Sequence, residues 1–289
     1  MSFTLTRLIT RPMPDGLAWQ GPSEGGHVLR WLGAAGFAVR AGQRTVLIDP
    51  YLSRFSLLAT ATRPLVPDEP LLARELPQAD AVLVGHAHFD HALDAPAVCR
   101  HTGARLYGSR STANIGRAYG LPEDQLVTCE GMEELDLGWG RAVPLPSRHG
   151  RVYFGRTPLQ GDIEAPPRWP PRYRALRHGK VFSWWLEWQG LSIVHIDSAD
   201  YDTALMQGRR ADVLCLCAIG RKYRPGYTAE IIAALKPGWV VACHWEDFFA
   251  PLSAPPRQLP AVDLPGFVEE IRACGADPVV LRPGQRMGL

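Results

Sequence analysis

The 289-residue sequence predicts a mixed α/β fold in which a pair of β-sheets is covered by helices. Three observations support this prediction. Short runs rich in β-branched residues recur along the chain, and most of them end at Gly, Asp or Pro. The early runs follow one another closely, as in hairpins, whereas helix-length segments separate the later runs. Hydrophobic residues make up 46% of the chain, which is enough for the core of one large domain.

The apolar runs and the helix signals between them give an order of elements. The expected strands are residues 28–33, 37–41, 45–49, 81–85, 104–108, 126–129, 181–188, 191–196, 212–217, 239–243 and 278–281. The expected helices are residues 95–101, 112–119, 203–209, 229–235 and 266–274. Pro237-Gly238 would end the fourth helix, and Pro265 would begin the fifth.

One segment, residues 151–180, departs from this pattern. It contains five prolines and is rich in arginine and aromatic residues. This composition is too rich in proline for regular structure and too aromatic for a disordered linker. We therefore expect one domain over residues 1–289, with residues 151–180 inserted as a lid or rim.

Composition limits the partners and the compartment. The formal net charge of +2 supplies no field that would attract nucleic acid or an anionic membrane. The six cysteines contain no CxxC pair, and most lie in apolar runs, as is typical of reduced buried thiols. No signal-like or membrane-spanning apolar stretch is found. We expect a cytoplasmic protein without a nucleic-acid partner.

The stretch VLVGHAHFDHALD, residues 82–94, places three histidines and two aspartates directly after an apolar run. Asp94 precedes a further helix signal and could cap that helix. Capping does not explain the HxHxDH pattern that starts at His86, which is too specific to expect by chance. Imidazole and carboxylate groups are common zinc ligands. The motif therefore predicts a metal site at the end of a strand.

Neighbouring residues of a tight loop can face two different ions. His86 and His88 would face one ion, while Asp90 and His91 would face a second. Two ions need more than four ligands. Three further candidates each follow an apolar strand: His149, Asp197 and His244.

This order of HxHxDH, a lone histidine, an aspartate after a strand and a final histidine resembles the metallo-β-lactamase superfamily. The resemblance covers nearly the whole chain and implies a four-layered αβ/βα sandwich with a dinuclear metal site at one edge. It implies that one metal is held by His86, His88 and His149. It implies that the second metal is held by Asp90, His91 and His244, and that Asp197 bridges both. The expected cofactors are two divalent ions, zinc first, with manganese or iron as alternatives.

Residues 31–53 resemble the opening of one branch of this superfamily, which contains ascorbate-6-phosphate lactonase and the phospholipase D acting on N-acyl phosphatidylethanolamine. In that branch Asp49 would support the metal loop from behind the ligands, and we expect Asp94 to start a helix or to buttress the same loop. Two features depart from the branch. The segment after His149 is long, and His244 is followed by Trp-Glu-Asp, which would place acids near the second metal.

The expected chemistry is hydrolysis. Two ions that share a water would lower its pKa and present hydroxide to a carbonyl carbon or a phosphorus. Asp197 and Asp90 would hold the ions and the water. The candidate proton donors are His195, on the same strand face as Asp197, and Tyr223, after another strand; a structural histidine and a solvated turn are the alternatives.

The expected substrate is a small anionic ester, phosphodiester or lactone. Guanidinium groups bind phosphate or carboxylate, and aromatic rings cover flat or acyl groups. The candidate substrate contacts are Arg151, Tyr153, Arg156, Arg221 and Trp245. A solvated surface loop or a dimer contact is the alternative for the insertion. A lipid substrate and an oligomeric state stay open.

Two other functions compete with the hydrolase. A mononuclear iron dioxygenase of the same fold keeps the HxHxDH motif, so the sequence does not exclude it. A glutamate in place of His88 would be typical of the diiron reductases, which argues against that class. A non-catalytic, metal-stabilised binding protein is the third alternative, and the filled ligand positions argue against it.

Overall fold

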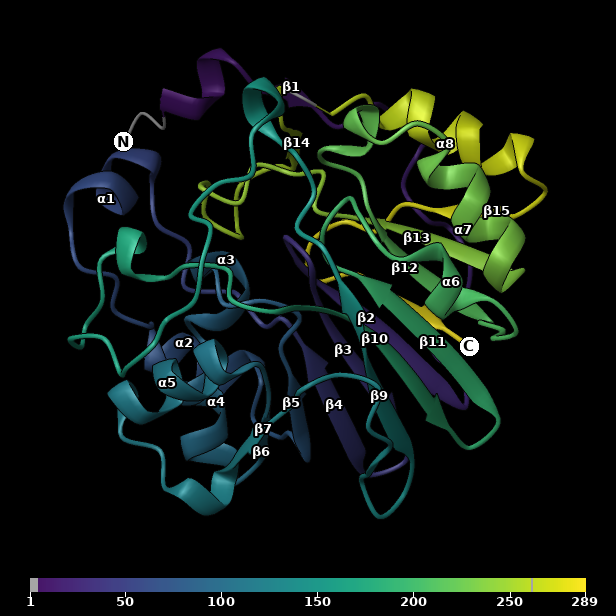
Figure 1. Ribbon diagram of the computed structural model, residues 1–289. Coiled ribbons are helices and arrows are strands. Elements are labelled where there is room, and N and C mark those ends of the chain that lie inside the picture. Colours follow the sequence, from purple (N-terminus) through teal and green to yellow (C-terminus); the bar gives the residue numbers. More distant parts are fainter. Residues whose placement is uncertain (1–4, 261) are drawn as a thin grey trace.

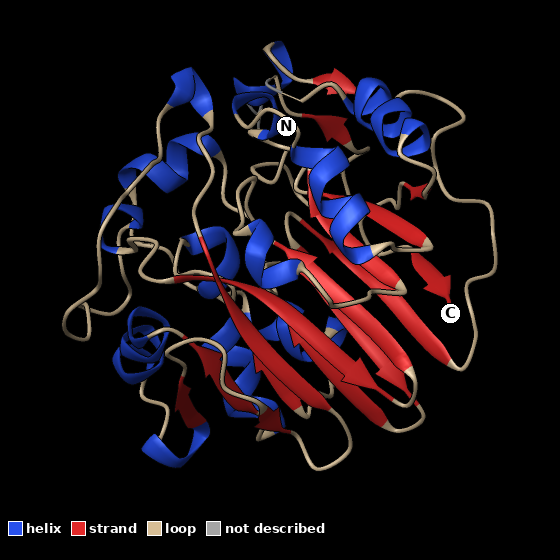
Figure 2. Cartoon of the chain, turned by 45° about the vertical axis from the view of Figure 1, so that its right-hand side comes forward, coloured by secondary structure: helices blue, strands red, loops and turns tan. Residues whose placement is uncertain are grey.

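The computed structural model describes residues 5–260 and 262–289. Two seven-stranded sheets lie at its centre, with helices on their outer sides (Figures 1 and 2). This is the predicted mixed α/β architecture, in which helices cover a pair of sheets. One continuous apolar core lies between the sheets and beneath the helices.

The first sheet has the strand order β16-β2-β3-β4-β5-β6-β7. Its strands are β2 (His27–Gly33), β3 (Gly36–Ala41), β4 (Arg44–Ile48), β5 (Ala81–Leu83), β6 (Arg105–Gly108), β7 (Leu126–Thr128) and β16 (Arg286–Gly288). Strands β2 to β4 pair antiparallel, and β4 to β7 pair parallel. The parallel strands therefore end at one common edge.

The second sheet has the strand order β15-β13-β12-β11-β10-β9-β8. Its strands are β8 (Leu135–Asp136), β9 (Arg141–Ser147), β10 (Val181–Trp188), β11 (Leu191–Ile196), β12 (Val213–Cys217), β13 (Trp239–Cys243) and β15 (Asp277–Val279). Strands β11, β12, β13 and β15 pair parallel. A separate short pair joins β1 (Arg11–Pro12) to β14 (Arg257–Gln258).

Helices α4 and α5 contact the first sheet, and α8 contacts the second. The helices are α1 (Leu57–Thr62), α2 (Glu69–Glu75), α3 (Phe89–Ala92), α4 (Ala95–Thr102), α5 (Arg110–Tyr119), α6 (Thr203–Met206), α7 (Tyr227–Leu235) and α8 (Leu264–Ala273). The 3-10 turns are η1 (Leu5–Leu8), η2 (Glu123–Gln125), η3 (Tyr153–Gly155), η4 (Tyr173–Ala175) and η5 (Arg221–Tyr223). No helix of residues 5–260 or 262–289 is both long and apolar enough to cross a bilayer.

Most expected elements are found within a residue or two, and the differences have local causes. The helix expected over residues 203–209 ends at Met206, because Gln207 is extended and Gly208 has a φ of 76°. Strand β9 is not among the strands whose ranges were expected, although His149 was expected to follow an apolar strand, because Pro144 and Pro146 interrupt its pattern. Only the first two residues of β9 pair with β8, and both prolines lie beyond them. There β9 forms the edge of the sheet, so fewer of its N–H groups need partners.

Residues 151–180 run from the end of β9 past α1 and α5 to β10 (Figure 1). Backbone hydrogen bonds fix this path at two points: Leu65 N–H donates to Pro171 O at 2.7 Å, and Ala87 N–H donates to His178 O at 2.9 Å. The segment contains only the turns η3 and η4, in agreement with its proline content. It therefore lies against both α1 and the loop after β5.

Candidate metal centre

The seven predicted ligands come together at the edge where the parallel strands end. Three overlapping clusters have their ligand atoms within 4.8 Å of one another: His86, His88 and His149; His86, His91 and Asp197; and Asp90, His91 and His244. His86 Nε2 lies 3.0 Å from His88 Nδ1, and His244 Nε2 lies 3.3 Å from Asp90 Oδ2. The first and third clusters have the composition that was predicted for the two metals. Asp197 lies between them, with Oδ2 2.6 Å from His86 Nδ1 and 3.9 Å from His91 Nδ1.

The loop after β5 presents four of these side chains. His88 occupies the N-cap position of α3 in an extended conformation, but its side chain makes no capping hydrogen bond. Its ring is therefore free to turn toward His86. Asp90 and His91 follow in the first turn of α3, and both are buried. A short helix placed directly after a strand thus directs consecutive side chains into one buried site.

Asp49 supports this loop from behind, at the position that was predicted for it. Its Oδ1 accepts a hydrogen bond from Gly85 N–H at 2.7 Å, and its Oδ2 accepts one from His91 Nδ1–H at 2.8 Å. In the neutral form of His91, the second bond fixes the tautomer, so that Nε2 has its lone pair available to a metal. Asp49 therefore orients one ligand and holds the backbone of the metal loop.

Asp94 is fully buried and holds a different loop. Its carboxylate accepts hydrogen bonds from the N–H groups of Leu52 and Ser53 and from Ser53 Oγ–H. It stands at the N-cap position of α4 but makes no capping hydrogen bond. Asp94 therefore stands at the start of a helix, as one of its two expected roles had it, but its side chain holds the loop through Leu52 and Ser53 and not the metal loop.

The ionisation of the cluster suits a pair of cations. Burial lowers the pKa of His86 and His88 well below the ordinary value of 6.5 and lowers the pKa of His149 to about 4. These imidazoles are therefore neutral at pH 7, which is the form that binds metals. Two buried imidazole nitrogens, His88 Nε2 and His244 Nδ1, have no hydrogen-bond partner among the described residues. Buried neutral imidazoles beside buried carboxylates fit divalent ions.

These pKa shifts predict how the stability of the metal-free protein depends on pH. Below about pH 6.5 the unfolded chain binds protons on His86, His88 and His149 that the folded chain does not bind. We therefore expect the Tm of the EDTA-treated protein to fall between pH 7 and pH 5. Scanning calorimetry checks this, and a Tm that is constant or rises over this interval contradicts it.

His91 has the opposite effect. Burial alone would lower its pKa, but the carboxylates of Asp90 and Asp49 outweigh burial and raise it to about 9. Its contribution to stability is fully present below about pH 6.5 and is lost as the pH rises toward 9. The metal-free protein should thus be most stable near neutral pH.

A cavity of about 480 Å³ lies in front of the clustered ligands. The insertion, α1 and the segment after β13 form its walls; their lining residues include Tyr153, Leu159, Tyr173, Leu57, Phe248 and Phe249. Of the five predicted substrate contacts, only Tyr153 lines this cavity. Arg151 and Arg156 belong to the same insertion but are exposed and do not line it. The insertion therefore covers the site with its aromatic and apolar side chains.

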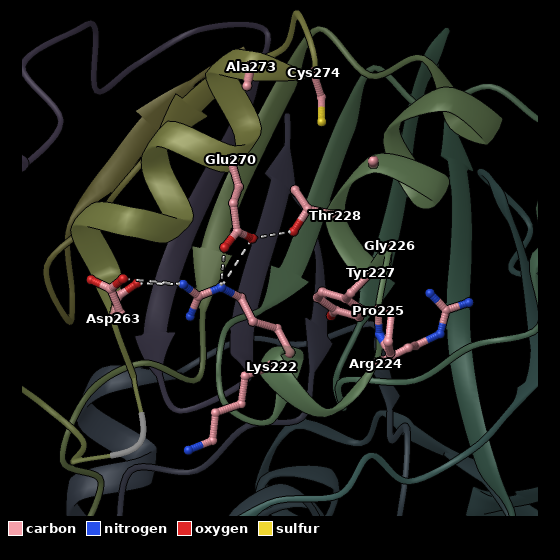
Figure 3. Close-up of a pocket in the computed structure, with 12 residues that line it drawn as sticks. Lys222, Arg224, Pro225, Gly226, Tyr227, Thr228, Asp263, Glu270, Ala273 and Cys274 are labelled. Carbon is pink, nitrogen blue, oxygen red and sulfur yellow. Dashed lines mark hydrogen bonds and ion pairs between the residues drawn. The ribbon is translucent and has the colours of Figure 1, made fainter.

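The structure places Arg221 and Trp245 elsewhere, which corrects their predicted role. Trp245 is fully buried and stacks on Trp31, with ring centroids 5.2 Å apart, because the chain turns inward after His244. Arg221 lies in a separate pocket between α7 and α8, where it pairs with Glu270. Figure 3 shows that the Glu270 carboxylate also points toward Thr228, whose hydroxyl donates to it at 2.9 Å.

The two predicted proton donors are not at the cavity either. His195 is fully buried, and its Nε2–H donates to Ala35 O at 2.8 Å, which is the structural role considered for it. It lies in β11, two residues before Asp197, but its ring packs on Phe37, on the side of the first sheet. Tyr223 lies in η5, where its ring faces Gly155 and Lys222. Neither side chain lines the cavity.

The acid that follows Trp245 does not add charge to the site. Glu246 Oε1 lies 2.8 Å from Arg54 Nη2 and accepts a hydrogen bond from Ala34 N–H at 2.9 Å. Both side chains of this ion pair are at most 5% exposed. The pair joins the loop that carries His244 to the loop that Asp94 holds. Glu246 therefore braces the site instead of supplying a ligand.

Sequence reasoning missed His178, which stacks on His149 with ring centroids 5.6 Å apart. A signal was present, because both histidines occur in an Arg-His-Gly tripeptide, one at each end of the insertion. In both, Nδ1–H donates to the carbonyl of the following glycine, at 2.8 Å for His149 and 2.6 Å for His178. The repeated tripeptide thus gives both rings the same local geometry beside the site.

Comparisons with known proteins place this site in a family. The beta-lactamase superfamily domain matches residues 44–245. A UPF0173 metal-dependent hydrolase of Methanopyrus kandleri is 26% identical over 274 residues, which cover 89% of this chain and 97% of the relative. One of Anaeromyxobacter sp. is 43% identical over 96 residues, 33% of this chain. That alignment covers only 31% of the length of the Anaeromyxobacter relative.

Solved structures share the fold at low sequence identity. The metallo hydrolase Igni18 of Ignicoccus hospitalis superposes with a TM-score of 0.58 at 18% identity, covering 90% of this chain and 97% of that one. CmlA, a diiron beta-hydroxylase of Streptomyces venezuelae, gives a TM-score of 0.60 at 18% identity. The superposition covers 92% of this chain and 54% of the CmlA chain. With the domain match over residues 44–245, these findings establish that the chain belongs to the metallo-β-lactamase superfamily.

Proposed function

We propose that this protein is a metal-dependent hydrolase with a dinuclear centre that acts on an ester, lactone or phosphodiester. The observation that carries the proposal is the set of three overlapping ligand clusters, which line one cavity. His86 belongs to the first and second clusters, and His91 belongs to the second and third. A single ion would not need all seven side chains. The names of the UPF0173 relatives support a hydrolase, and the fold is shared with CmlA, a diiron beta-hydroxylase.

The proposed ligands divide into two sets with one shared residue. His86, His88 and His149 would hold one ion; Asp90, His91 and His244 would hold the other; and Asp197 would contact both. Bound divalent ions would supply Lewis-acid polarisation of the electrophile and lower the pKa of a water molecule. Zinc suits the nitrogen-rich ligand set, and manganese or iron would fit the same residues.

Residues of this chain would position the water and protonate the leaving group. The Asp197 carboxylate would accept a hydrogen bond from the attacking water and so orient its lone pair. Tyr153 lines the cavity and replaces Tyr223 as the candidate proton donor. Tyr153 is 39% exposed, but partial burial in the cavity and the charges of Asp247 and Asp90 raise its pKa to about 12, so its hydroxyl keeps its proton at neutral pH. The insertion would exclude bulk water from the reacting groups.

The experiment is metal analysis of the purified full-length chain, followed by assays with p-nitrophenyl esters, lactones and bis(p-nitrophenyl) phosphate. We expect about two equivalents of zinc or manganese per chain, and EDTA-sensitive hydrolysis of at least one substrate class. One equivalent of iron, with oxygen consumption instead of hydrolysis, would support the dioxygenase alternative. Metal-loaded protein that fails against the whole panel would support a binding protein.

The resemblance of residues 31–53 to the branch with ascorbate-6-phosphate lactonase and N-acyl phosphatidylethanolamine phospholipase D stays a prediction, as does the cytoplasmic location. The branch is best separated from other hydrolases by its substrates. The assay panel should therefore contain a phosphodiester and a lactone side by side.

A further inference from the structure

The cavity in front of the ligand clusters is apolar on three sides. Helix α1 contributes Leu57 and Ala61, the insertion contributes residues 152, 158 and 159, and the segment after β13 contributes Phe248 and Phe249. Phe248 packs on the His244 ring at 5.1 Å and on Phe249 at 4.5 Å, measured between centroids. The apolar wall thus begins beside a proposed ligand and continues to Leu57, which is 40% exposed at the surface.

No lysine or arginine is among the described residues that line the cavity, although the insertion that covers it contains six arginines. None of these six arginines lines the cavity. Arg172 donates to Thr62 O at 2.9 Å, and Arg174 donates to the Tyr173 hydroxyl at 3.0 Å. Arg54, in the loop before α1, is paired with Glu246. An anionic group of a substrate, away from the metal ligands, would therefore find no counter-charge.

One of the neutral polar groups in the cavity wall is buried without a hydrogen-bond partner in the described part of the chain. The Thr60 side chain lines the cavity, is 4% exposed as a residue, and its Oγ1 has no hydrogen-bond partner among the described residues. A buried hydroxyl without a partner is costly unless a ligand or water satisfies it. Thr60 therefore offers a single hydrogen bond to an uncharged oxygen of a ligand.

We propose that the substrates are carboxylic esters or lactones whose acyl part is uncharged and apolar, and that Leu57 and Phe249 select this part. The proposal rests on the proposed hydrolase function and narrows its substrate class. Water adds to the acyl carbon, the acyl C–O bond breaks, and the leaving oxygen takes a proton of that water. An ester thus gives a carboxylic acid and an alcohol, and a lactone gives a single hydroxy acid. The anionic substrate that composition predicted is replaced by a neutral one.

The first test compares p-nitrophenyl esters from acetate to decanoate with the anionic p-nitrophenyl hemisuccinate, using the metal-loaded full chain. We expect kcat/KM to rise about two- to fourfold for each added methylene until the cavity is full. The hemisuccinate should be hydrolysed at least tenfold less efficiently than the butyrate. A preference for the hemisuccinate or for bis(p-nitrophenyl) phosphate overturns the proposal.

Two adjacent residues of α1 provide a matched pair of variants. Leu57 lines the cavity, whereas Leu58 is 62% exposed and does not line it. Leu57→Glu should lower kcat/KM for the octanoate by about tenfold or more, and Leu58→Glu should change it less than twofold. Leu57→Lys should raise the ratio of hemisuccinate to butyrate activity. Equal effects of the two glutamate variants contradict the proposal.

A binding measurement separates this proposal from the hydrolase function itself. The uncharged dye N-phenyl-1-naphthylamine should bind the full chain with or without EDTA, and decanol should displace it. Leu57→Glu should weaken dye binding at least fivefold, and Leu58→Glu should leave it unchanged. If no ester is hydrolysed but the dye binds in this pattern, the hydrolase function fails and the apolar ligand class stands. If the dye does not bind, or if decanoate and acetate react equally, the apolar class fails.

Discussion

The Asp197→Asn variant is expected to lose activity by a factor on the order of 10² to 10³ while keeping most of its bound metal. Asp197 lies between the two proposed metal positions, with Oδ2 2.6 Å from His86 Nδ1. Asparagine preserves the shape of the side chain but removes the negative charge that would hold both ions and orient the water. The three histidines of the first cluster keep their positions. Turnover should therefore fall before metal content does, as kcat and metal stoichiometry measured on one sample will show.

The same variant should not destabilise the metal-free protein. Burial, together with the charge of Asp49, raises the pKa of Asp197 well above its ordinary value, so this carboxyl group is unfavourable when no cation is present. We expect the Tm of Asp197→Asn in EDTA to equal or exceed that of the unmodified protein. Asp200→Asn is the matched control: Asp200 pairs with Arg148 and Arg224 outside the site, so activity should stay within about twofold. Retention of full activity by Asp197→Asn contradicts the bridging role.

Most of the proposed ligands could be brought together from the sequence, because each follows a strand that pairs parallel with a neighbour. The HxHxDH motif follows β5 directly, and Asp197 and His244 follow β11 and β13. Parallel strands carry the residues that follow them to one edge of a sheet, so strand-end residues of separate segments meet. Asp49, after β4, could be placed by the same reasoning. These predictions needed only the identity and order of the strands.

The substrate contacts could not be predicted in this way, because they depend on the path of an irregular segment. Composition alone suggested that the arginines of the insertion would face the ligand. The structure instead fixes the path through backbone hydrogen bonds to Leu65 and Ala87, and this turns Tyr153 and Leu159 inward. Such long-range bonds leave no pattern in a single sequence. The same limit explains Trp245, whose direction is decided by packing on Trp31.

The Gly85→Ala variant is expected to disrupt the site through one added methyl group. A Cβ at this position would lie 2.2 Å from Asp197 Oδ2 and 3.0 Å from Phe182 O. The backbone cannot move away easily, because Gly85 N–H donates to Asp49 at 2.7 Å and Gly85 O accepts from Phe182 N–H at 2.8 Å. Asp197 must therefore leave its position beside His86. We expect activity to fall at least 10²-fold, and the free energy of unfolding by about 1–3 kcal/mol.

Gly26→Ala and a double-mutant cycle separate this clash from a general effect of alanine. The nearest atom to a Cβ on Gly26 is Leu289 O at 3.9 Å, so that variant should match the unmodified protein in stability and activity. In the Asp197→Ala background the carboxylate atoms that the added methyl group would meet first are gone. We therefore expect Gly85→Ala to destabilise the Asp197→Ala protein less than it destabilises the unmodified protein, with a difference of at least about 0.5 kcal/mol. Urea denaturation of the EDTA-treated proteins measures both effects. If Gly85→Ala destabilises both proteins equally, the clash is with Phe182 and the loop backbone. The close approach to Asp197 is then not the reason why this position needs glycine.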